Sequence, residues 1–238
     1  MIRQTEHYFG FIGTLLGGAL ILFLFILVQD GVSSHYVDTA KLAVENKASD
    51  AWVVSIATFA SFLVCSTLIF ILVRFGTKDF LQYLAIKASS TPDLVKWLGV
   101  TALFLLVSHS IMYAMDKPFA DDYAVSLYTS ADALWLLLIA VIIIAPLFEE
   151  LFFRGYLFHG FSRSFLRPAG AVVLTSLLWG MVHPQYELYL VAIIFCQGIM
   201  LCLARMHTNS ILTCVLMHAL INTTVVLKTI YYVEFVAV

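Results

Sequence analysis

The sequence predicts an all-α, polytopic membrane protein, built as a helix bundle of about seven (six to eight) transmembrane helices. Of its 238 residues, 62% are apolar and 12% are Asp, Glu, Lys or Arg, whereas soluble domains have about 45–50% apolar and about 25% charged residues. The apolar residues form runs close to the roughly 20 residues that a spanning helix needs. A chain of this length holds little beyond such a bundle, so we expect residues 1–238 to form a single integral-membrane domain.

Seven apolar runs predict the spans in chain order. They cover residues 8–28, 51–73, 94–115, 133–158, 169–183, 188–204 and 210–230. The first run is too long for the apolar part of a signal peptide, and it is interpreted as a span. The polar residues 29–50 are expected to form a loop or a short surface helix. In the connection 74–93, residues 80–86 are apolar enough to lie along the membrane interface, and an eighth element could hide there.

Charge excludes one class of partner and predicts the orientation. The 13 basic and 15 acidic residues give a net charge of −2, which is too balanced for nucleic-acid binding. In a seven-span chain most basic residues fall on one side: Arg3, Arg74, Lys78, Lys87, Lys96, Arg154, Arg163, Arg167 and Arg205. The positive-inside bias therefore places the N-terminus inside, with the bacterial cytoplasmic membrane as the expected location. The four cysteines lie in apolar runs without CxxC spacing, so we expect neither a disulfide framework nor a cysteine metal site.

A cluster of ionisable residues lies within the fourth run. Glu149, Glu150 and Arg154 follow the apolar stretch 134–148, and such side chains inside a span cost about 2.5–3.5 kcal/mol each on insertion scales. Glu150 and Arg154 are four residues apart and can pair on one helical face, while Glu149 lies about 100° round the helix and can point elsewhere. Pro146 is expected to kink the helix and open space beside it. The alternative is that these charges only mark the end of the span and reach into the headgroups.

Polar residues on two later runs favour a site. His183 ends the fifth run, and His218 and Asn222 lie four residues apart in the seventh. At about 1.5 Å per helical residue, Glu149 and His183 are both roughly 21–23 Å from the turn that joins their helices, and Asn222 is at a similar height. Residues from three helices are therefore expected to meet in one layer near the middle of the bilayer.

These residues carry a family resemblance. Glu149-Glu150-Leu151-Phe152-Phe153-Arg154, then Trp179 to His183, then His218 to Asn222, resemble the EExxxR, aromatic-xxx-His and HxxxN motifs of the CPBP intramembrane proteases. That family contains the CAAX prenyl endopeptidases and bacteriocin-processing proteins. The resemblance covers residues 139–224, and it departs from the family at Trp179, where Phe is more common.

The resemblance implies an endopeptidase that hydrolyses a membrane-associated peptide or protein. Glu149 would be the base that activates water, and His183 would help to hold or polarise that water. His218 and Asn222 would donate to the oxyanion, and Glu150 and Arg154 would support the first helix. The alternative makes Glu149, His183 and His218 ligands of a catalytic zinc, although the compact HExxH spacing is absent. We favour the metal-free glutamate version without a cofactor.

Two functions of other classes stay open at this stage. One is a non-catalytic immunity or partner-binding protein on the same scaffold. The other is a small proton-coupled transporter, whose buried Glu and His would relay protons. The predicted clustering of polar groups in one layer favours a closed site over a path through both leaflets.

Overall fold

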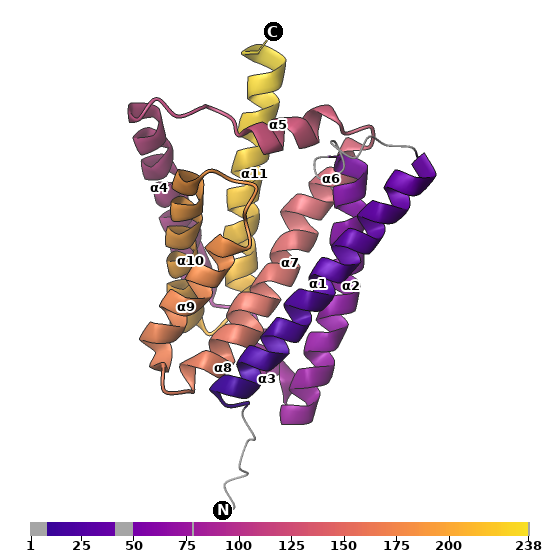
Figure 1. Cartoon of the computed structure of the whole chain (residues 1–238). Coiled ribbons are helices and arrows are strands. Elements are labelled where there is room, and N and C mark those ends of the chain that lie inside the picture. The colour runs from indigo at the N-terminus through magenta and orange to yellow at the C-terminus, as the bar shows by residue number, and fades with distance from the viewer. Residues whose placement is uncertain (1–8, 41–49, 78, 238) are drawn as a thin grey trace, which may run out of the picture.

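The computed structural model describes residues 9–40, 50–77 and 79–237, and they form helices and connecting loops without a strand (Figure 1). In this part of the chain six helices are long and apolar enough to cross a membrane. The prediction of a polytopic all-α bundle with six to eight spans is therefore confirmed.

The elements follow the chain in this order: α1 (Phe11–Ala40), α2 (Ala51–Gly76), α3 (Phe80–Leu84), α4 (Thr91–Ala114), α5 (Asp122–Thr129), α6 (Leu134–Ile139), the π-helix η2 (Ala140–Ile144), α7 (Ala145–Glu150), the π-helix η3 (Leu151–Leu157), α8 (Phe158–Ser162), α9 (Arg167–Met181), α10 (Leu188–Thr208) and α11 (Ile211–Phe235). The segments α6 to α8 continue one another as a single span, Leu134–Ser162, here called the central span. Its π segment η3 contacts α1, α2, α3, α9, α10 and α11, so the bundle is organised around it.

Each predicted span corresponds to a helix, but the fifth is short. Helix α9 has 15 residues, about 22 Å of rise, which is less than the roughly 30 Å of a bilayer core. It ends at Met181 because Pro184 follows shortly after, and the residue before a proline is disfavoured in helical conformation. His183 consequently lies in the connection to α10 and not on the helix.

One connection differs from expectation, and a second holds a short helix. Helix α1 runs on to Ala40, so the first part of the predicted loop 29–50 continues the span; no proline interrupts it. Residues 41–49 of that loop lie outside the described residues. The connection 74–93 holds the short helix α3, which packs Tyr83 and Leu84 against the bundle and leaves Leu81 exposed.

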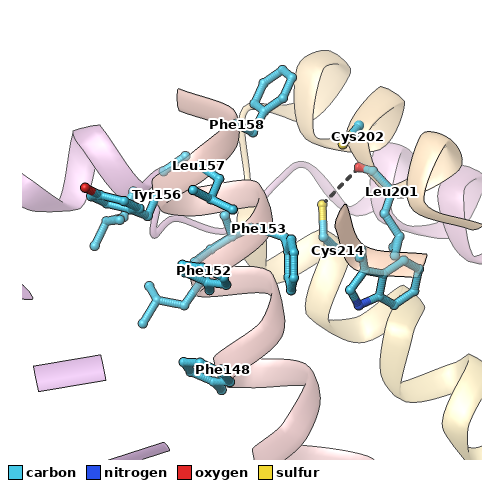
Figure 2. Packing of buried hydrophobic residues seen from close by; sticks show 14 of the residues in the cluster. Phe148, Phe152, Phe153, Tyr156, Leu157, Phe158, Leu201, Cys202 and Cys214 are labelled. Carbon is cyan, nitrogen blue, oxygen red and sulfur yellow. Dashed lines mark hydrogen bonds between the residues drawn. The ribbon is translucent and has the colours of Figure 1, made fainter. Parts of the chain in front are cut away.

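The helix α1 approaches the central span closely. A Cβ atom built on Gly17 would overlap the Tyr156 hydroxyl, and one built on Gly160 would overlap the side chain of Thr14. Small residues of this kind allow membrane helices to pack backbone to backbone. Figure 2 shows the aromatic side chains of α7 and η3, among them Phe148 and Phe152, which stack with ring centroids 6.0 Å apart.

The π segments of the central span leave backbone carbonyls that side chains of other helices satisfy. In η2 the Ala145 N–H donates five residues back to Ala140, and Pro146, which follows, has no N–H to donate. The Val141 carbonyl instead accepts from Nδ2 of Asn222 on α11, 2.7 Å away. In the middle of η3 the Arg154 carbonyl accepts from Nε of Arg205 on α10, at 3.2 Å. The two insertions thus tie the central span to its neighbours.

The loop between α3 and α4 holds the start of α11 in place. The backbone N–H of Ile211 donates to the Ala85 carbonyl at 3.0 Å, and Thr213 donates from Oγ1 to Oγ of Ser89 at 2.8 Å. Ser210 caps the helix by accepting from the Thr213 N–H. This anchoring sets the height of α11, and with it the height of His218 two turns further on.

Candidate active site

The adjacent glutamates of the central span face different surroundings. Oε2 of Glu149 accepts a hydrogen bond from Nε1 of Trp179 on α9, at 2.6 Å. Oε1 of Glu150 accepts from Nη1 of Arg154 at 2.9 Å, and both of these side chains are fully buried. The predicted i,i+4 pair between Glu150 and Arg154 is therefore confirmed, and it lies inside the protein, not at the headgroups.

Glu150 also holds a histidine from α11. Nδ1 of His218 lies 2.9 Å from Oε1 of Glu150, which leaves Nε2 as the ring nitrogen not engaged by this pair. A carboxylate that is paired with an arginine only accepts hydrogen bonds, so Nδ1 carries a proton. The Arg154 guanidinium lies 4.4 Å from the centroid of the Trp179 ring, and that ring stands edge-on to His218 with centroids 5.3 Å apart.

His183 is fixed in one tautomer by the backbone carbonyl of Trp179, four residues earlier. Its Nδ1 lies 2.7 Å from the Trp179 carbonyl, and because a carbonyl only accepts, Nδ1 is the protonated nitrogen. In the neutral ring Nε2 is then an acceptor. Tyr186 stacks on the imidazole with centroids 6.0 Å apart and an interplanar angle of 16°.

The side chains gather at a cavity of about 650 Å³, a size typical of sites for small ligands. Glu149, His183, His218 and Asn222 all line it, whereas Glu150 and Arg154 do not. The cavity continues between α1, α2, α4, α5 and α11, where its wall is largely apolar. The structure thus brings the four predicted catalytic residues to one space and keeps the two supporting residues behind it.

The alternative zinc site has donor atoms but no assembled ligand set. In the described part of the chain no three His, Cys, Asp or Glu side chains converge as metal ligands would. The bonds of Oε2 of Glu149 and of the two Nδ1 atoms leave Oε1 of Glu149 and Nε2 of His183 and His218 for other contacts. Histidines that bind a metal are held by such an Nδ1 bond, so these three residues would be the ligands, and a bound zinc would supply an activated water.

Two features of the site were missed from the sequence. The sequence identified Trp179 only as the aromatic residue of the second motif, but its indole N–H also bonds to Glu149. Tyr186 stacks on His183 from the loop that follows, and burial raises the pKa of its hydroxyl, so the group stays protonated. No local pattern marks a loop tyrosine as a neighbour of the site, because its position depends on where α9 ends.

Comparison with known proteins identifies the same region of the chain. Residues 131–224 match the family model described as type II CAAX prenyl endopeptidase Rce1-like. The matched segment starts just before the central span and ends two residues after Asn222, so it contains the three motifs. No curated protein and no solved structure matched the chain.

Proposed function

Because residues 131–224 match the family model of the type II CAAX prenyl endopeptidases, we propose that the chain is an intramembrane endopeptidase in which Glu149 activates the attacking water. The observation that carries this assignment is the division between the two glutamates. Glu150 forms a buried ion pair with Arg154. Glu149 lines the cavity, and only its Oε2 is bonded to Trp179, which leaves Oε1 outside that hydrogen bond.

The first step is attack on the scissile carbonyl. Oε1 of Glu149 takes a proton from water as the oxygen bonds to the carbonyl carbon. Nε2 of His183, an acceptor in the neutral ring, holds the second proton of that water. Since Nδ1 of His183 is fixed by a backbone carbonyl, the ring is oriented before the water arrives.

The negative charge that develops on the carbonyl oxygen needs donors. Asn222 donates one N–H of its amide to the Val141 carbonyl, and its second N–H would donate to the oxyanion. His218, whose Nδ1 is held by Glu150, would donate to the oxyanion from a protonated Nε2. The tetrahedral intermediate then collapses as the protonated Glu149 returns its proton to the leaving amine. Loss of one oxyanion donor costs on the order of 10²–10³ in rate, which is the effect expected for Asn222→Ala.

The substrate class follows from the family and from the cavity. The matched family is named for prenylated CAAX substrates, and the apolar wall of the cavity suits a lipid-bearing or membrane-embedded peptide. We therefore propose a membrane-associated peptide or protein as substrate, reached from the bilayer. We also propose that the chain lies in a bacterial cytoplasmic membrane with its N-terminus inside, which reporter fusions at the two ends would test.

The test is cleavage by purified protein in proteoliposomes. Fluorogenic peptides with and without a prenyl group should be cut by the parent protein and not by Glu149→Gln. Glu187→Gln makes the same change on an exposed carboxylate outside the cavity, and it should retain activity. Full activity of Glu149→Gln would remove Glu149 as the base. A cellular phenotype that persists in this variant would favour the binding or scaffolding alternative.

Metal dependence is tested on the same preparation. Activity should survive a strong chelator, and elemental analysis should find no stoichiometric metal. Activity that disappears on chelation and returns with zinc would overturn the metal-free mechanism and favour Glu149, His183 and His218 as ligands.

A further inference from the structure

Beyond Tyr189 at its start, helix α10 presents a stripe of four side chains to the cavity, and Gln197 is the polar member of that stripe. The stripe consists of Leu190, Ile193, Ile194 and Gln197, spaced as one face of an α-helix. Gln197 is the residue of the stripe furthest along the helix, and it was not singled out by any of the three sequence motifs.

The Gln197 amide faces the cavity without a protein partner. The residue is 7% exposed and lines the cavity, and among the described residues its side chain makes no hydrogen bond, ion pair or ring contact. A primary amide has two donor protons and an acceptor oxygen, and those of Gln197 are open to the cavity and not enclosed among protein atoms. The amide can therefore form hydrogen bonds with a ligand bound in the cavity.

The packing of α10 on α11 places Gln197 in the catalytic layer. The Cys214 thiol donates to the Leu201 carbonyl at 3.3 Å (Figure 2), so these residues lie at one height on the two antiparallel helices. Four residues back along α10 and four forward along α11 give Gln197 and His218, again at one height. The next residue, Gly198, receives Nη2 of Arg154 on its carbonyl at 3.4 Å.

We propose that Gln197 is a substrate-binding residue whose amide pairs with a peptide group of the bound substrate beside the scissile bond. The two groups are complementary, because the carboxamide N–H can donate to the peptide C=O and the carboxamide oxygen can accept from the peptide N–H. The other three members of the stripe supply apolar contacts only, so this pairing would fix the register of an extended peptide relative to Glu149. The inference rests on the proposed endopeptidase function.

The test compares Gln197→Met with the parent protein. Methionine keeps the length of the side chain and removes its hydrogen bonds. On the peptide that the parent cleaves fastest, kcat/KM should fall about three- to tenfold, as for loss of one neutral hydrogen bond, and mainly through KM. The melting temperature should not fall, since the Gln197 amide makes no bond within the fold that the change would remove. Gln82→Met, the same change on an exposed residue of α3, is the control.

Ester analogues locate the contact. Replacing one peptide N–H at a time by oxygen should weaken cleavage by the parent at several positions, and at one of them the penalty should vanish in Gln197→Met. The inference is overturned if Gln197→Met matches the control in kcat/KM, or if it lowers the melting temperature, which would mark a structural role. If the parent cleaves no peptide, the proposed function fails and this inference with it; an active parent with a neutral Gln197→Met overturns this inference alone.

Discussion

The indole Nε1 of Trp179 lies 2.6 Å from Oε2 of Glu149 and joins the short helix α9 to the central span at the candidate base. The donor exists because residue 179 is Trp, since a Phe at this position would have no N–H to donate. The bond occupies one carboxylate oxygen, and in the proposed mechanism the other oxygen accepts a proton.

Substitution Trp179→Phe should therefore impair the chemical step. The aromatic ring stays between Arg154 and His218, but Glu149 loses the bond that orients it, and misplacement of a reacting group lowers rates on the order of ten- to a hundredfold. Steady-state kinetics should show a lower kcat with KM nearly unchanged. Trp135→Phe, on an exposed tryptophan outside the cavity, is the matched control. An unchanged kcat with a lower melting temperature would reduce Trp179 to a packing residue.

The same substitution, Glu to Gln, should lower the stability of the protein at position 150 and its activity at position 149. Glu150→Gln leaves the fully buried Arg154 without an ionised partner and removes the acceptor of His218. Breaking one side of a buried ion pair typically costs about 3–5 kcal/mol. Glu149→Gln keeps an acceptor for Trp179 and faces the cavity, so it should abolish activity with little change in stability.

Thermal unfolding of both variants in one detergent measures the difference. A melting temperature that falls for Glu150→Gln and stays near the parent value for Glu149→Gln is expected. Equal destabilisation of the two variants would show that Glu149 is also part of the structural network.

The sequence predicted the position of the spans well, because an apolar run of about 20 residues is a direct physical requirement of the bilayer. It also predicted the Glu150–Arg154 pair, since four residues is a fixed helical spacing. Both predictions depend on local sequence alone. The same holds for the four catalytic candidates, which carry recognisable motif spacings.

Other features depend on contacts between helices and have no local signature. The π segments η2 and η3 could not be predicted from the sequence, because their carbonyls accept hydrogen bonds from Asn222 and Arg205 on other helices. The attachment of His218 to Glu150 and not to Glu149 depends on the rotation of α11 against the central span. Gln197 looked like an ordinary residue of an apolar helix until its neighbours were in place.

The close packing of α1 on the central span gives a prediction about stability far from the chemistry. In Gly160→Ala the new Cβ would lie 2.6 Å from Cγ2 of Thr14 and 2.9 Å from its Cβ. These atoms are at the root of a fully buried side chain, so α1 itself has to move. Overpacking of this kind typically costs about 1–3 kcal/mol.

Gly31→Ala is the control, because it lies on α1 with no atom within 4 Å of the new Cβ, and alanine favours a helix by about 1 kcal/mol over glycine. A lower melting temperature for Gly160→Ala, beside an equal or higher one for Gly31→Ala, is expected. Since α1 also lines the cavity through Leu22 and Phe25, its displacement should raise KM for an apolar peptide before it affects kcat. An unchanged melting temperature in Gly160→Ala would mean that α1 is not held against the central span at this contact.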